Sequence, residues 1–364
     1  MSQRIVIVGG GVVGAMLAYR LSAHAQVTLL DRQLPAQGST GAALGVLMGA
    51  ISRKTKGRAW AMRQQSMASY DALIDELQQR TEQIISYNHH GIVKLLFAED
   101  DRDRWEALAQ TRQAQGWPLA LWEREELRDR CPDFALSSDR FGAVTGAVYS
   151  AGDRQVHPQQ LTLALLEAAR HQGAHTRFGA EVKAVGVGPS VTLASGELIE
   201  ADWVVLTAGL GTSLLAAQET IDIRPVLGQA VEVLLPRSLG ADGFYPAMTG
   251  HDIHIVPVDS ASSEPRYWVG ATVEFPKGEA EPVAIEAERQ AMWAGAIALC
   301  PALEQATVVR HWWGKRPRPY NRPAPIIEAL PGHDNVIVAS GHYRNGVLLA
   351  PATAQKVTEM LGLG

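Results

Sequence analysis

The residues with the clearest chemical role lie within the first 32 positions of the chain. The pattern Gly9-x-Gly11-x-x-Gly14 follows an apolar, strand-like run over 4–8 and opens a helix-like run over 13–23. Gly9 permits a tight turn, Gly11 lets a diphosphate reach the backbone amides, and Gly14 lets the helix pack closely on the strand. The free amides and partial positive charge at the helix N-terminus then favour the diphosphate.

An acidic residue completes this pattern at the end of a second strand-like run over 26–30. Asp31 lies 22 residues after Gly9, close to the ~20 typical of a carboxylate that binds the adenosine ribose. The unit predicts a site for the ADP half of a dinucleotide and does not separate FAD from NAD. A 2′-phosphate is disfavoured by Asp31, although Arg32 is adjacent. The residues predicted to bind cofactor here are Gly9, Gly11, Val12, Val13, Gly14, Asp31 and Arg32.

Composition excludes several other classes of protein. The 364 residues carry a net charge of −5, which gives no electrostatic reason to expect nucleic acid or an anionic membrane as partner. Only two cysteines occur, and the histidines lack strong metal-binding spacing, so we predict no disulfide framework, no metal and a cytoplasmic location. Glycines interrupt the apolar run near the N-terminus, which favours a βαβ unit over a signal peptide, and no apolar stretch is long enough to span a membrane.

The elements that must position these residues alternate between two kinds of pattern. Parallel α/β character dominates at the start, returns near 150–210 and returns again at the end, while antiparallel β character dominates between. The predicted fold is therefore α/β, with a discontinuous Rossmann-like domain (1–85, 150–220 and 325–364) interleaved with an antiparallel β-rich α+β substrate domain (86–149 and 221–324). Within it we predict helices over 58–79, 101–115, 161–171 and 351–361, long antiparallel strands over 225–235, 251–258 and 267–272, and a proline-rich irregular loop over 316–325.

Several further segments resemble the D-amino acid oxidase family of FAD oxidoreductases, most closely its glycine oxidase and sarcosine oxidase branch. The segment Gly38-Ser-Thr-Gly-Ala-Ala-Leu-Gly45 looks like the second flavin-binding stretch of the family, and Thr207-Ala-Gly209 looks like its strand-end motif. Segments 152–158 (GDRQVHP) and 224–229 (RPVLGQ) are also similar, so the resemblance covers nearly the whole chain. It implies an FAD site that includes Ser39, Thr40, Ala43, Gly45, Val182, Thr207, Ala208 and Gly209.

The most specific similarity lies in residues 341–353, GHYRNGVLLAPAT, which match the C-terminal signature of this branch nearly residue for residue. The segment is a glycine-rich loop that leads into a helix N-terminus. In the family, that helix end points at the flavin N1–C2=O region, where negative charge accumulates on reduction. The resemblance adds Gly341, His342, Arg344, Asn345, Gly346, Val347 and Leu348 to the cofactor-binding residues.

The resemblance also implies a substrate site. An arginine suits an amino-acid substrate because its guanidinium binds a carboxylate through two parallel hydrogen bonds. Arg316 occupies the family's carboxylate-binding position and Arg344 is the second candidate; Lys315 should point away from the site, because side chains alternate along a strand. His254 stands where a substrate-binding tyrosine is expected, as either a hydrogen-bond donor or a structural histidine, and Val273 replaces a methionine. These two departures put glycine in doubt as the preferred substrate.

Taken together, the resemblance implies oxidative deamination of a small primary or secondary α-amino acid. A hydride passes from Cα to the flavin, the imino acid hydrolyses to a 2-oxo acid, and oxygen is reduced to hydrogen peroxide. No cysteine lies in 316–325, so noncovalent FAD is expected. Three alternatives remain: a dehydrogenase that passes electrons to a quinone or carrier, an enzyme acting on a tRNA nucleotide, and a non-catalytic FAD- or NAD-binding protein. The enantiomer, and whether the chain forms a homo-oligomer, also stay open.

Overall fold

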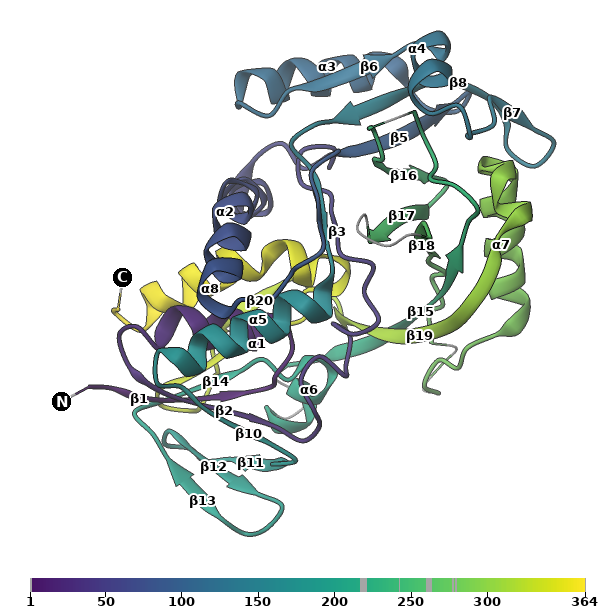
Figure 1. Ribbon diagram of the computed structural model, residues 1–364. Helices are drawn as coiled ribbons and strands as arrows, with labels where there is room; N and C mark the ends of the chain where they lie inside the picture. Colours follow the sequence, from purple (N-terminus) through teal and green to yellow (C-terminus); the bar gives the residue numbers. More distant parts are fainter. Residues whose placement is uncertain are drawn as a thin grey trace.

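The computed structural model describes residues 2–216, 221–241, 243–259, 264–276, 278 and 280–363, whose strands form two main sheets and two small ones (Figure 1). The first main sheet has six strands in the order β10-β2-β1-β14-β21-β20. All neighbours in it are parallel except β20 and β21, which confirms the α/β class. Its strands are β1 (Arg4–Val8), β2 (Gln26–Asp31), β10 (His175–Phe178), β14 (Trp203–Leu206), β20 (Ile326–Ala329) and β21 (Val336–Ser340).

Both faces of this sheet are covered, as its nearly continuous Val, Ile and Leu content requires. Helices pack on one face in a single apolar cluster, and the small antiparallel sheet β11-β12-β13 packs on the other (Figure 1). The helices are α1 (Val12–Leu21), α2 (Gly57–Thr81), α5 (Pro158–His171) and α8 (Gly346–Met360); the small sheet is β11 (Val182–Val185), β12 (Ser190–Leu193) and β13 (Leu198–Glu200).

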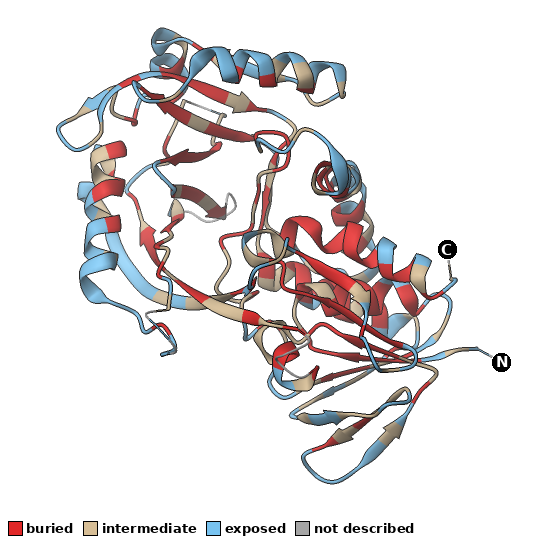
Figure 2. Ribbon diagram, turned by 180° about the vertical axis from the view of Figure 1, so that it is seen from behind, coloured by how far each residue is buried: buried red, intermediate tan, exposed pale blue. Residues whose placement is uncertain are grey.

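The second main sheet is antiparallel except where β16 meets β5, and its strands run in the order β19-β15-β18-β17-β16-β5-β8-β6, with β7 against β8. Helix α7 (Glu286–Leu299) covers one face of it, with its outer side exposed (Figure 2). The strands are β5 (Ile92–Phe97), β6 (Leu119–Trp122), β7 (Ser137–Ser138), β8 (Gly142–Ser150), β15 (Ile223–Leu234), β16 (Ala247–Gly250), β17 (Ile253–Asp259), β18 (Arg266–Gly270) and β19 (Thr307–Pro319).

The face of this sheet opposite α7 is called the site face below. Side chains alternate along a strand, so residues paired across neighbouring strands share a face. The register places one row of paired residues on the site face, running from β5 to β19: Lys94, Thr249, His254, Gly270, Ala230 and Trp312.

A long connection, residues 42–51, crosses the site face from β19 to β5. At one end the Trp312 Nε1 donates a hydrogen bond to the Ala42 carbonyl (3.1 Å). Leu44 then packs among the site-face residues of β15, β17 and β18, and Ile51 packs against those of β5 and β8. This connection therefore packs against the second main sheet from β19 across to β5 and β8.

The remaining elements are short or peripheral. A three-stranded sheet, β3-β9-β4, lies between the two main sheets, and the predicted domain boundaries stay a prediction. The elements not yet given are β3 (Val46–Leu47), β4 (Tyr87–Asn88), β9 (Arg154–Val156), α3 (Arg102–Ala114), α4 (Arg124–Arg130), α6 (Thr212–Leu215) and the 3-10 turns Gly209–Gly211, Pro301–Gln305 and Tyr343–Asn345.

Two predicted boundaries are wrong. The loop predicted over 316–325 is a strand in its first four residues, because β19 pairs with β15 as far as Pro319; prolines are tolerated there since β19 is an edge strand. The last helix begins at Gly346 rather than at Pro351. Pro351 lacks the amide that would bond to the Val347 carbonyl, and the Tyr70 hydroxyl donates to that carbonyl instead.

Candidate functional site

The glycine loop has a backbone that only glycine can supply. Gly9 has a φ of 119°, and a Cβ on it would lie 2.6 Å from the Thr207 carbonyl oxygen. A Cβ on Gly14 would lie 1.9 Å from the Gly9 oxygen. Gly11 precedes the first residue of α1 and offers no side chain to cap the helix. The helix N-terminus therefore opens directly onto the space above the loop, as a diphosphate site requires.

The polar residues around this loop face it. The Asp31 carboxylate accepts hydrogen bonds from the Gly10 and Gln33 amides (2.5 and 2.8 Å), which fixes it beside the loop. The Thr40 hydroxyl accepts one from the Val12 amide (3.1 Å). Val13 is half-buried and Arg32 is exposed.

The residues predicted from the other segments lie along the same edge of the sheet. The Thr207 hydroxyl donates to the Val8 and Gly9 carbonyls (both 3.0 Å), and Ala208 and Gly209 continue from it. Val182 packs partly buried against the cluster that contains Leu30.

Residues 38–45, which resemble the second flavin-binding stretch of the family, are hydrogen-bonded to β19. The Ser39 hydroxyl donates to the Lys315 carbonyl (2.7 Å). Gly45 has a φ of 73°, and a Cβ there would lie 1.7 Å from the Val156 oxygen; Ala43 is half-buried nearby. This stretch and the glycine loop form one cradle at the carboxyl ends of the parallel strands, onto which the N-terminus of α1 opens. The cradle fits FAD.

The signature loop runs between this cradle and β19. Gly341 has a φ of 68°, and a Cβ on it would meet the Pro319 Cγ at 2.8 Å. His342 is buried with its Nε2 2.8 Å from the Thr353 hydroxyl; burial, with the Arg58 charge second, lowers the pKa of His342 to about 3. It is therefore neutral at pH 7 and positions the loop. Asn345, Gly346, Val347 and Leu348 then begin α8.

Arg316 is half-buried on the site face, and no acid among the described residues pairs with it. Its guanidinium donates to the carbonyls of Leu227 (3.0 Å) and Thr272 (3.1 Å) and lies over Gly228. Burial first, and the Arg344 charge second, lower the pKa of Arg316. Two cations held close enough to sense each other favour an anionic ligand between them.

Arg344 and His254 complete the group. Arg344 is exposed and pairs with Asp252 at 3.4 Å, which links the signature loop to the turn from β16 to β17. The half-buried His254 has an Nδ1 atom that is itself buried and has no hydrogen-bond partner in the part of the chain that the structure describes. Burial lowers the pKa of His254 to about 4; Asp252 opposes the shift, whereas Arg344 and Arg316 add to it. His254 is thus a neutral imidazole that faces the site with an unsatisfied nitrogen.

The structure therefore brings together all three residues predicted for the substrate site, and Lys315 pairs with Glu281 instead. The sequence alone did not indicate that Gly228, Thr249 and Lys94 lie at this site, because their positions depend on strand register.

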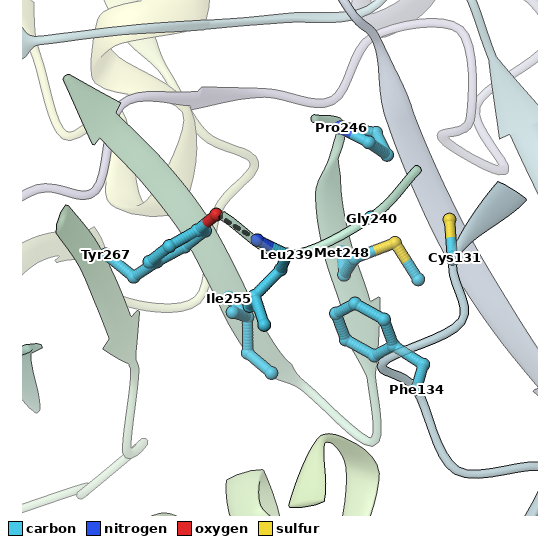
Figure 3. A pocket seen from close by; sticks show the side chains of 8 residues that line it. All are labelled: Cys131, Phe134, Leu239, Gly240, Pro246, Met248, Ile255 and Tyr267. Atoms are coloured by element: carbon cyan, nitrogen blue, oxygen red, sulfur yellow. Dashed lines mark hydrogen bonds between the residues drawn. The ribbon is translucent and has the colours of Figure 1, made fainter. Parts of the chain in front are cut away.

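The small pocket in Figure 3 does not belong to this site. Two of its lining residues, Ile255 and Tyr267, adjoin the site-face residues His254 and Trp268 in sequence, so the pocket lies on the opposite, α7 face. Among the described residues, no group of three or more His, Cys, Asp or Glu side chains could hold a metal ion. No helix in that part of the chain is long and apolar enough to cross a membrane.

The family model for FAD dependent oxidoreductases (DAO) matches residues 4–360. The chain is 31% identical to glycine oxidase of Pseudomonas putida, with 99% of this chain and 95% of that protein covered. It is 29% identical to glycine oxidase of Geobacillus kaustophilus, with 98% and 92% covered. The crystal structure of glycine oxidase from Geobacillus kaustophilus superposes with a TM-score of 0.86 at 28% identity, covering 99% of this chain and 95% of that one.

The fold and the cradle define an FAD-dependent oxidoreductase. The chain belongs to the DAO family, as its resemblance predicted.

Proposed function

We propose that this protein is an FAD-dependent oxidase of a small primary or secondary α-amino acid. The observation that carries the proposal is the half-buried guanidinium of Arg316, which has no acid partner among the described residues and lies beside Arg344 at the edge of the FAD cradle. A guanidinium held by two backbone carbonyls keeps its remaining N–H groups available for a carboxylate. The glycine oxidase relatives support this substrate class.

Each residue of the site then has a role. Arg316 anchors the substrate carboxylate, and Arg344 exchanges its weak contact with Asp252 for the same carboxylate at the entrance. Neutral His254 offers its unsatisfied ring to the bound amino acid. The chemistry that bound FAD would supply is acceptance of a hydride from Cα and transfer of the electrons to oxygen.

Positioning is the main contribution of the chain in this proposal. His254 and His342 are neutral and so are not charged bases, and no such base is needed when the substrate amine reacts in its neutral form. The fixed guanidinium supplies orientation, because it presents the substrate in one pose.

The test is hydrogen peroxide production by the purified holoenzyme under air with glycine, sarcosine and D-alanine. We expect peroxide with at least one of them. Reduction of an artificial dye without peroxide would favour a dehydrogenase that uses a quinone or carrier. A colourless protein that cannot be reconstituted with FAD would refute the proposal altogether.

Two further parts of the proposal concern the cofactor linkage and the location. The FAD is noncovalent, so acid precipitation should leave the yellow colour in the supernatant, and a yellow pellet would contradict this. The location is cytoplasmic, which two buried cysteines without a disulfide favour.

A further inference from the structure

Three polar side chains lie next to one another on the site face, on three adjacent strands. The register pairs Lys94 of β5 with Thr249 of β16, and Thr249 with His254 of β17. Lys94 is the one residue of β5 that is not fully buried. At the strand spacing of ~4.8 Å, the row extends roughly 10 Å from His254 toward β5. It begins beside the proposed substrate site and leads away from it.

None of these three side chains has a hydrogen-bond partner among the described residues. Lys94 makes no ion pair there either, and its only ring contact is Trp105, whose centroid lies 5.8 Å from the ammonium nitrogen. The Nδ1 of His254 is buried and unsatisfied. Polar groups on a half-buried surface are normally paired, and a row of three unpaired groups indicates a ligand.

Apolar clusters flank the row of Lys94, Thr249 and His254 on both sides. On one side lie Leu44, Val256, Val258 and Trp268, and on the other Ile51, Leu96 and Val148. An otherwise apolar wall with a few convergent polar groups is the usual composition of a small-molecule site.

Of the cationic side chains near this row, two form ion pairs and two do not. Arg53 pairs with Asp100 at 3.7 Å, and Arg344 pairs with Asp252. Arg316 is assigned to the α-carboxylate, which leaves Lys94 as a cation in the row that forms no ion pair among the described residues. Burial lowers the pKa of Lys94 and the Arg53 charge adds to the shift, whereas Asp100, Asp252 and Glu99 oppose it. Because none of these acids forms an ion pair with Lys94, the ammonium gains from an anion placed directly beside it.

We propose that Lys94, Thr249 and His254 form a subsite for a second carboxylate, so that the preferred substrate is an α-amino acid whose side chain or N-substituent carries another carboxylate. This rests on the proposed function. Lys94 supplies the charge, the Thr249 hydroxyl donates a hydrogen bond, and neutral His254 contributes one N–H.

The test compares acids with their amides of equal size. Iminodiacetate, N-(2-carboxyethyl)glycine and N-(3-carboxypropyl)glycine are achiral secondary amines, and each has a mono-amide that differs only in the second charge. We expect kcat/KM to favour the acid over its amide by about 10- to 100-fold for at least one length, the range of one hydrogen bond to a charged group. Equal values, or preference for the amide at every length, would overturn the subsite.

Two variants assign the effect to Lys94. Lys94→Met should reduce the acid-to-amide ratio to near one, and Lys94→Arg should restore part of it. Lys315→Met is the matched control, because Lys315 pairs with Glu281 away from the site, and its ratio should equal that of the wild type. An unchanged ratio in Lys94→Met would overturn the assignment.

A binding measurement separates this inference from the proposed function. Glutarate has the same chain length as iminodiacetate but no amine, so calorimetric titration of the holoenzyme needs no turnover. Glutarate should bind about 10-fold or more tightly than its mono-amide, and Lys94→Met should remove the difference. Peroxide from sarcosine without any diacid preference would overturn the subsite alone, whereas diacid binding with no amine oxidation would overturn the proposed function alone.

Discussion

The change Gly228→Ala moves the Arg316 guanidinium without removing its charge. A Cβ on Gly228 would lie 2.2 Å from Nη2 and 2.5 Å from Cζ of Arg316, so the guanidinium must leave its place over β15. Gly228 does not have a positive φ, and the atoms it would meet are the end of a flexible side chain. The backbone therefore tolerates the alanine, and the fold should lose little stability.

The magnitude follows from the contacts of Arg316. Its guanidinium is aligned by the carbonyls of Leu227 and Thr272, and displacement breaks this alignment. Hydrogen bonds to charged groups contribute ~1.5–3 kcal/mol, so loss of the aligned pair to a carboxylate should reduce kcat/KM by about 10- to 100-fold. FAD content and thermal stability should stay close to those of the wild type.

The assay is peroxide release with the best substrate, together with flavin absorbance and a thermal melt of each variant. Gly188→Ala is the matched control, because a Cβ on Gly188 would meet nothing within 4 Å, and its kcat/KM should equal that of the wild type. Wild-type kcat/KM in Gly228→Ala would show that Arg316 does not anchor the substrate at this place.

Three further predictions test other parts of the structure. Gly14→Ala should purify without flavin absorbance, because its Cβ would lie 1.9 Å from the Gly9 oxygen; a yellow variant with normal FAD affinity would contradict the cradle. Folding lowers the pKa of His254 to about 4, so between pH 6.5 and 4 the unfolded chain binds more protons than the folded one. The free energy of unfolding should therefore decrease as the pH is lowered from 6.5 to 4. The decrease should be smaller in His254→Gln than in the wild type. Equal pH profiles in denaturant titrations would contradict this. Asp153→Asn should lower the free energy of unfolding by ~2 kcal/mol, because the buried carboxylate accepts hydrogen bonds from three amides of 49–51; an unchanged unfolding midpoint would show otherwise.

Residues close together in the sequence could be interpreted without the structure. The glycine loop and Asp31 are joined by one strand, one helix and a second strand, so local spacing is enough to place them at one sheet edge. The family resemblance extended this to the signature loop and to Arg316. The predicted α/β class and FAD dependence are confirmed.

Contacts between distant segments are what the sequence could not give. The last helix begins at Gly346, where the Val347 carbonyl accepts a hydrogen bond from the hydroxyl of Tyr70, 277 positions away in the sequence. In the sequence alone, Pro351 predicts a later start for this helix. Several strands were missed for a similar reason: β8 and most of β19 are held by pairing to β5 and β15 rather than by alternating patterns of their own.

The sequence by itself predicted a dinucleotide site, because that site depends on a short motif whose backbone only glycine can adopt and on one acid at a fixed spacing. The resemblance to a known family supplied FAD and the class of chemistry. The tertiary structure decided what surrounds the substrate. Strand register places Lys94 and Thr249 beside His254, and burial is the largest cause of the lowered pKa that keeps His254 neutral. Register and burial are properties of the packed sheet, and a single strand's sequence does not contain them.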